Sequence, residues 1–277
     1  MKPGAVRLAV ADLEGTRAFY ERTIGLRPCE PVDDVTPLDA NGSTVVELLS
    51  SPQAPPRPAG TTGLFHLAIL VPSRLELARS LRRVVQSGWS LTGASDHLVS
   101  EALYLSDPEG NGIEVYRDRP REEWRYADGQ LQMSTLPLDL QGLAAELGDG
   151  GESGSGVAAG TRIGHVHLNV ADLDDAERFY HGALGLEVTV RGYPGALFVA
   201  SRGYHHHVGL NTWAGEGAPP APPGARGLRR FELLADDEAE LERVEHGLAE
   251  AGVEATRVGD GIETADPSAN RVLLRSE

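Results

Sequence analysis

The sequence contains the stretch Gly-His-Val-His-Leu-Asn-Val-Ala-Asp-Leu at residues 164–173. Successive side chains of a β-strand point to opposite faces, so its two histidines and its asparagine are predicted to share one face. The aliphatic residues between them take the other face. Asp172 stands where an N-cap would open a helix, and Gly185 stands where a left-handed glycine would end it. The stretch therefore predicts a strand with one core side and one polar side, followed by a helix.

The same pattern occurs once before, because residues 4–26 align without a gap to residues 164–186 at an offset of 160. The earlier copy has Ala5 where the later one has His165. The identical pairs are Gly4/Gly164, Val6/Val166, Leu8/Leu168, Val10/Val170, Ala11/Ala171, Asp12/Asp172, Leu13/Leu173, Phe19/Phe179, Tyr20/Tyr180, Gly25/Gly185 and Leu26/Leu186. This density of identities indicates an internal duplication.

A second kind of unit follows each copy. In the first half it is predicted to have a strand at 65–71, an amphipathic helix at 74–88, a turn at 107–111 and a last strand at 112–116. In the second half the matching ranges are 230–234, 238–251, 266–270 and 271–275. The chain thus reads as four βαβββ modules, named A, B, A′ and B′ in chain order, and its predicted fold class is α+β.

The length of 277 residues favours two domains. Two proline-rich stretches, 52–60 and 215–224, are predicted to connect the modules of each half, and the Gly, Glu and Ser of 148–156 are typical of a flexible linker. The predicted division is a first domain at 1–120, a linker at 121–161 and a second domain at 162–277.

Composition restricts the partners. A net charge of -16 argues against nucleic acid or an anionic membrane as a partner, since binding phosphate groups requires a basic surface. The single cysteine, Cys29, excludes an intramolecular disulfide. No signal peptide is recognised at the N-terminus, and no run reaches the roughly 20 apolar residues of a membrane span. The expected location is the cytoplasm.

Several motifs together resemble the vicinal oxygen chelate superfamily, which includes glyoxalase I, bleomycin-resistance proteins and extradiol dioxygenases. The resemblance is greatest to its two-domain catechol-2,3-dioxygenase group, and it covers most of the chain except the linker. The motifs are Asp96-His97 with Ser100-Glu101-Ala102, Asp-Pro-Glu-Gly-Asn-Gly-Ile-Glu at 107–114, Asp118-Arg119-Pro120 with Trp124, and Tyr-His-His-His at 204–207 leading into Gly-Leu-Asn-Thr-Trp at 209–213. The resemblance implies modules paired into two cupped, partly open mixed β-barrel domains, with helices outside and a divalent metal on the floor.

In such a family, each module can offer one ligand from its first strand and one from its last. Module B offers His66 and Glu114 at these positions. Module A′ offers His165, and the offset of 160 puts His207 where module A has Glu47. The positions of the other ligands are filled by Ala5, Arg230 and Leu273, so neither half carries a full set.

Two pairings of modules would complete a site. If B and A′ share one cup, it contains His66, Glu114, His165 and His207, and two imidazoles with one carboxylate are the ligand set of a non-haem Fe(II) oxygenase. If A pairs with B, the cup contains Glu47, His66 and Glu114, a set similar to that of glyoxalase. We favour the first pairing because histidines survive in A′ and not in A.

Two further histidines are candidates for catalysis. His97 would accept the second phenolic proton of a catechol, although it could instead be a surface turn residue. His205 and His207 are predicted to share a face, with His206 on the opposite one, and His205 is assigned an acid–base role. The alternative is a polar edge without function.

The sequence therefore predicts a ring-cleaving dioxygenase that acts on a catechol-like vicinal diol and O₂, with Fe(II), or else Mn(II), as its metal. One alternative is a non-catalytic ligand-binding protein of the resistance type with a degenerate site. The other is a glyoxalase-like lyase with Ni(II) or Zn(II). A homodimer is left open.

Overall fold

The computed structural model describes residues 1–127, 130–148 and 156–277, and it contains all four predicted βαβββ modules. Module A consists of β1 (Lys2–Val10), α1 (Leu13–Phe19), the π-helical turn η1 (Tyr20–Ile24), β2 (Arg27–Pro28), β3 (Val35–Ala40) and β4 (Ser43–Ser50). Module B consists of β5 (Gly63–Leu70), α2 (Arg74–Gln86), β6 (Gly93–Asp96), β7 (Ser100–Ser106) and β8 (Gly112–Asp118). Module A′ consists of β12 (Arg162–Asn169), α4 (Leu173–Glu177), the π-helical turn η3 (Arg178–Ala183), β13 (Glu187–Tyr193), β14 (Ala196–Ala200) and β15 (Val208–Asn211). Module B′ consists of β16 (Gly227–Ala235), α5 (Glu238–Glu250), β17 (Ala255–Val258), β18 (Gly261–Ala265) and β19 (Arg271–Ser276).

The aspartates and glycines predicted to begin and end the repeated helices take these positions in the structure. The Asp12 side chain accepts a hydrogen bond from the Gly15 amide, and Asp172 does the same for the Asp175 amide. Gly25 and Gly185 follow these helices with positive φ angles of 94° and 77°, a conformation that costs glycine little.

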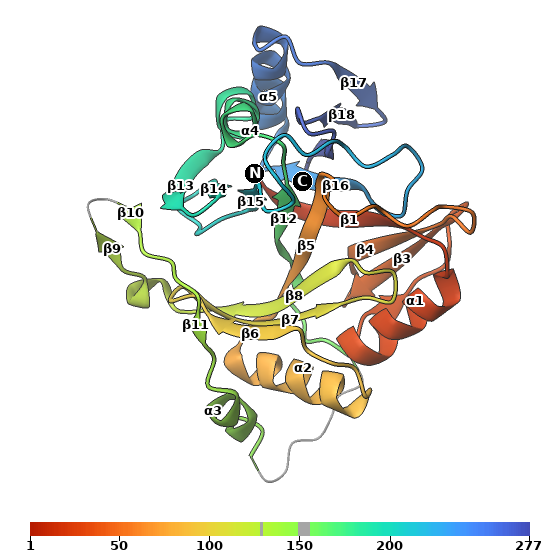
Figure 1. Cartoon of the computed structure of the whole chain (residues 1–277), viewed down its shortest axis with the longest axis vertical. Coiled ribbons are helices and arrows are strands. Elements are labelled where there is room, and N and C mark those ends of the chain that lie inside the picture. Colours follow the sequence, from red (N-terminus) through yellow and green to blue (C-terminus); the bar gives the residue numbers. More distant parts are fainter. Residues whose placement is uncertain (128–129, 149–155) are drawn as a thin grey trace.

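The modules form two large curved sheets that join different halves of the chain. One has the strand order β17-β18-β19-β16-β1-β4-β3-β2, and the other has the order β11-β6-β7-β8-β5-β12-β15-β14-β13, where β11 is Leu136–Pro137. In the first sheet A meets B′ through antiparallel β1 and β16, and in the second B meets A′ through antiparallel β5 and β12. The helices lie on the outer sides of the sheets (Figure 1). The expected α+β fold of cupped half-barrels is therefore confirmed.

The favoured pairing of B with A′ is confirmed by these ladders, whereas a cup made from A and B is not formed. Each sheet takes one module from 1–120 and one from 162–277, so neither cup coincides with a predicted domain. The division into domains at these boundaries stays a prediction.

The predicted linker at 121–161 contains structure of its own where it is described. Besides β11, it contains the 3-10 turn η2 (Arg121–Glu123), β9 (Tyr126–Ala127), β10 (Gln130–Leu131) and α3 (Leu140–Ala145). β11 extends the second sheet by pairing with β6, and β9 pairs with β10. Most of the glycine-rich linker predicted at 148–156 lies outside the described residues.

One apolar core runs through all four modules. It includes Val6, Ile69, Val166 and Phe231, each from the first strand of its module and each fully buried or nearly so. Within the described ranges, no helix is long and apolar enough to cross a membrane. Because this core includes residues of all four modules, it holds the two sheets in fixed positions relative to each other.

Candidate metal centre

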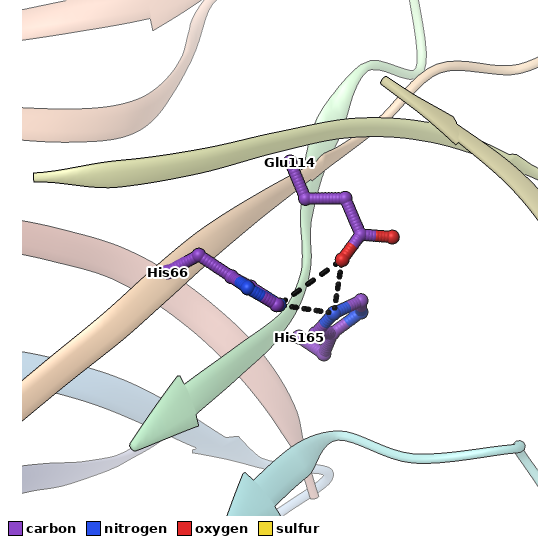
Figure 2. A group of neighbouring side chains, drawn as sticks. All are labelled: His66, Glu114 and His165. Carbon is purple, nitrogen blue, oxygen red and sulfur yellow. Dashed lines mark hydrogen bonds and ion pairs between the residues drawn. The ribbon is translucent and has the colours of Figure 1, made fainter. Parts of the chain in front are cut away.

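Three of the predicted ligands meet on the concave face of the second sheet. His66 on β5, Glu114 on β8 and His165 on β12 point toward one another (Figure 2). The Nε2 atom of His66 lies 3.0 Å from Oε2 of Glu114 and 3.3 Å from Nε2 of His165, and Nε2 of His165 lies 3.2 Å from the same carboxylate oxygen. All three side chains are buried.

The strand register explains why these residues converge. Ala68 on the central strand β5 is opposite Glu114 on one side and opposite His165 on the other. Two residues earlier on β5, and therefore on the same face of the sheet, His66 lies between Gly112 on β8 and His167 on β12. Each large polar side chain therefore has a small neighbour, which leaves room on one face of the sheet for all three ligands.

The spacing of the three atoms fits a divalent ion. Nitrogen and oxygen ligands lie about 2.1 Å from a divalent transition metal, so two ligands at a right angle are about 3 Å apart. The three observed separations lie between 3.0 and 3.3 Å. Two neutral imidazoles and one carboxylate that occupy one side of an ion form a facial triad, which leaves the other positions open.

The protonation states also suit metal binding. Burial raises the pKa of Glu114, but the adjacent imidazoles of His165 and His66 outweigh it and hold that pKa well below its usual range. Burial lowers the pKa of His165 to about 4, with Glu114 offsetting part of the effect. At neutral pH the triad thus has an ionised Glu114 carboxylate and a neutral His165 imidazole, the forms that bind metal.

His165 is held in place by ring packing together with the contacts of its Nε2 atom to Glu114 and His66. Its Nδ1 atom is buried without a hydrogen-bond partner among the described residues. The ring lies against His206, with 4.0 Å between centroids, and against Tyr116, with 4.9 Å between centroids.

A cavity of about 540 Å³ opens over the triad. Its walls include His97 and Tyr104 on one side and His167 and His206 on the other. The aromatic residues of the wall are Phe65, Tyr104, Tyr193, Phe198 and Trp213. A cavity of this size with apolar walls and a few polar groups is typical of a small-molecule site.

His97 lies in this wall, where it contacts Tyr104, a residue that the sequence analysis did not identify. Its Nδ1 atom lies 2.7 Å from the Ser134 carbonyl oxygen, and its Nε2 atom lies 2.7 Å from the Tyr104 hydroxyl. A carbonyl only accepts, so Nδ1 carries the proton of the neutral ring and Nε2 accepts from Tyr104. Burial, followed by the charge of Glu114, raises the pKa of Tyr104 well above its usual value, which keeps its hydroxyl protonated.

His205 and His206 lie the opposite way from the prediction. His206 lines the cavity, whereas His205 is fully buried behind it, with Nε2 3.0 Å from Asp118 and Nδ1 2.7 Å from Nδ1 of His206. The prediction assumed a strand with alternating faces at these positions. β15 begins only at Val208, and residues 201–207 form turns in which the alternation does not hold.

His207 does not join the triad. Its Nδ1 atom accepts a hydrogen bond from the Ser201 amide, and its ring stacks on Tyr204 at 4.9 Å. The offset of 160 fails here because module A′ has two more residues than module A between its first and last strands: Val6 is opposite Val46, but Val166 is opposite Val208.

The position that corresponds to Glu47 is therefore Gly209. A Cβ atom there would lie 2.9 Å from the His167 ring, so glycine makes room for this imidazole. Burial lowers the pKa of His167 well below its usual value, and its Nε2 atom has no partner in the described protein. Glu47 itself lies in the other sheet, ion-paired with Arg7 at 2.6 Å, so the glyoxalase-like set is not assembled.

The chain is similar in sequence to proteins of one known superfamily. The sequence profile of the Glyoxalase/Bleomycin resistance protein/Dioxygenase superfamily matches residues 2–115 and 162–269. The chain is 42% identical over 269 residues to a catechol-2,3-dioxygenase of Bacillus subtilis. This alignment covers 95% of this chain and 93% of the relative.

Two solved structures share the fold at low sequence identity. A dioxygenase candidate from Bacillus subtilis aligns with a TM-score of 0.68 and 13% identity, over 100% of this chain and 85% of the other. Glyoxalase I from Zea mays aligns with a TM-score of 0.58 and 16% identity, over 99% of this chain and 91% of the other. The chain belongs to the glyoxalase, bleomycin resistance protein and dioxygenase superfamily.

Proposed function

We propose that the protein is a metal-dependent extradiol dioxygenase that cleaves the ring of a catechol-like vicinal diol. The observation that carries the proposal is the buried triad of His66, Glu114 and His165 at the floor of an aromatic-walled cavity. The 42% identical relative named as a catechol-2,3-dioxygenase supports the choice of reaction. Fe(II) is the first choice of metal because two histidines and one carboxylate are the ligand set of non-haem iron oxygenases, and Mn(II) is the second.

When bound by these three residues, the ion would supply Lewis acidity toward the two diol oxygens and the redox chemistry of O₂. The protein supplies the orientation of the substrate. Phe65 and Trp213 stand in edge contact at 5.1 Å, both partly exposed, beside the cavity. A flat aromatic ring between such walls is held by stacking and edge contacts, and its diol is directed at the triad.

Two routes in the protein can take the protons of the diol. The Tyr104 hydroxyl donates to Nε2 of His97, so its oxygen can accept a hydrogen bond from a substrate hydroxyl while its own proton moves toward His97. This modifies the role predicted for His97, which acts through Tyr104 and not on the substrate directly.

The second route ends at His206. The Asp118 carboxylate accepts from Nε2 of His205, which in its neutral form leaves Nδ1 to accept from Nδ1 of His206. Burial lowers the pKa of His206 well below its usual value, so this ring is neutral and its Nε2 atom is unprotonated. Asp118 and His205 are then positioning residues that fix the tautomer of His206 as a base.

Asp118→Ala is expected to lower kcat by about 10- to 100-fold with little change in KM, because His206 loses its fixed tautomer while the cavity keeps its shape. Asp118→Asn keeps an oxygen that can accept from His205 and should retain more activity. Steady-state kinetics on both variants, loaded with the same metal, make the comparison. Equal kcat for wild type and Asp118→Ala would rule out this role.

The function is tested by loading the metal-free protein anaerobically with Fe(II), Mn(II) or Zn(II) and then adding catechol in air. Ring fission yields a yellow product that a spectrophotometer records, and we expect it with Fe(II) or Mn(II) and not with Zn(II). His246→Ala, on the exposed face of α5, is the control for histidine loss, and His66→Ala should give no product. A protein that binds iron at the triad yet yields no product across a panel of catechols would refute the proposal.

A further inference from the structure

The first sheet has a second cleft, and its lining includes Arg230, which is equivalent to His66 of the metal centre. Arg7 pairs with Arg230 across β1 and β16, in the same register in which His167 pairs with His66 across β12 and β5. The cleft has a volume of about 580 Å³. One of its walls is the proline-rich connector at 220–223, which the sequence analysis had predicted only as a link between modules.

This cleft is rich in positive charge although the chain as a whole has a net charge of -16. Three glutamates form ion pairs with its arginines: Glu47 with Arg7, Glu109 with Arg226, and Glu263 with both Arg230 and Arg271. The arginines that line the cleft are Arg7, Arg57, Arg226, Arg229, Arg230 and Arg271. The six guanidinium groups thus exceed their three paired carboxylates by three charges.

Two of these arginines have no carboxylate partner among the described residues. Arg229 donates to the carbonyl oxygens of Ala225 and Gly224, and Arg57 makes no hydrogen bond or ion pair within the described part of the chain. Burial lowers the pKa of both, and for Arg229 the neighbouring charge of Arg271 adds to the effect.

Two further donors are buried without an acceptor. The Nε atoms of Arg226 and Arg230 are hidden from solvent and have no hydrogen-bond partner among the described residues. Partly desolvated cations that repel one another are costly unless an anion compensates them. A guanidinium matches a carboxylate or phosphate with two parallel hydrogen bonds.

We propose that this cleft is a binding site for a small oxyanion, a molecule that carries a carboxylate or phosphate group. In this arrangement the two duplicated sheets have different roles. One has the metal triad, and the other, with Arg230 at the position of His66 and Arg7 at the position of His167, holds an anion. The proposal does not depend on the metal centre or on the dioxygenase reaction, since no residue of the cleft lies in the triad or its cavity.

The test is isothermal titration calorimetry of the full-length protein with sodium phosphate and, separately, with disodium succinate, each at an ionic strength matched with sodium chloride. Wild type should show saturable binding of at least one of them. The double variant Arg57→Gln/Arg229→Gln should bind at least ~10-fold more weakly, because two guanidinium groups that have no carboxylate partner among the described residues are lost. Arg243→Gln, which removes the same charge from the exposed side of α5, should bind like wild type.

Saturable binding of phosphate alone would identify a phosphorylated ligand, and binding of succinate alone a carboxylate. Circular dichroism checks that the variants are folded. Arg57→Gln alone, which loses no hydrogen bond or ion pair to the described residues, replaces the double variant if that one unfolds. Without anion, Arg57→Gln should melt no lower than Arg243→Gln, since a partly desolvated charge has been removed with no hydrogen bond or ion pair among the described residues. Absence of saturable binding to wild type, or undiminished binding to the cleft variants, would overturn the proposal.

Discussion

Glu114→Gln is expected to remove the metal and the activity together. The amide has the size of the carboxylate but no charge, and an uncharged oxygen is a poor ligand between two imidazoles. Since loss of a residue that merely supports a ligand costs 10- to 100-fold in metal affinity, loss of the ligand's charge should cost more than ~100-fold. Iron content after desalting, measured by a colorimetric chelator, should fall from about one ion per chain to a small fraction.

The twin module provides a matched control. Glu47 on β4 is opposite Arg7 in the same register in which Glu114 is opposite Ala68, so the two glutamates hold equivalent positions in modules A and B. Glu47→Gln should keep iron and activity, because this side chain pairs with Arg7 in the other sheet. If Glu114→Gln retained the iron stoichiometry of wild type, the metal would have to bind elsewhere, and the proposed triad would be wrong.

The fold and two-thirds of the triad follow from local patterns in the sequence. Duplicated strands, N-cap aspartates and closing glycines specify the modules, and those signals act over a few residues. His66 and Glu114 belong to one module, so their pairing through parallel β5 and β8 is a consequence of the βαβββ unit itself.

Interactions between modules are harder to predict from the sequence. The third ligand, His165, reaches the site only because β12 pairs with β5 instead of the sheet closing within each half. This choice depends on the shapes of whole modules, and the only hint in the sequence was that A′ kept histidines where A had lost them. The error at His207 arose from two extra residues between the first and last strands of A′, which a gap-free alignment cannot detect.

The position of Tyr104 beside Glu114 could have been predicted from the sequence. The turn at 107–111 closes a hairpin between β7 and β8, and the register of that hairpin puts Tyr104 directly opposite Glu114. Cross-strand neighbours on one face are the contacts that a hairpin register fixes. The sequence therefore held the information for Tyr104, whereas the turns at 201–207, which turn His206 inward, follow no such period.

Gly112→Ala should destabilise the protein and loosen the metal centre, although it adds only one methyl group. A Cβ atom at Gly112 would lie 2.2 Å from the backbone carbonyl oxygen of Phe65 and 3.1 Å from Cβ of His66. A backbone atom cannot turn away as a side chain can, so β8 must move from β5. Overpacking of this kind costs about 3 kcal/mol, which in a protein of this size lowers the melting temperature by roughly 5 °C.

The same displacement separates two ligands, because His66 lies on β5 and Glu114 on β8. Iron should therefore raise the melting temperature of Gly112→Ala less than it raises that of wild type, since the stabilisation by a bound ligand increases with the logarithm of its affinity. Gly93→Ala in the same sheet is the control: within 4 Å its Cβ atom would meet only the Tyr104 side chain of the described protein, at an ordinary 3.8 Å. Scanning calorimetry of both variants with and without iron distinguishes them. Equal melting temperatures for Gly112→Ala and Gly93→Ala would contradict the idea that close contact between β5 and β8 holds the triad together.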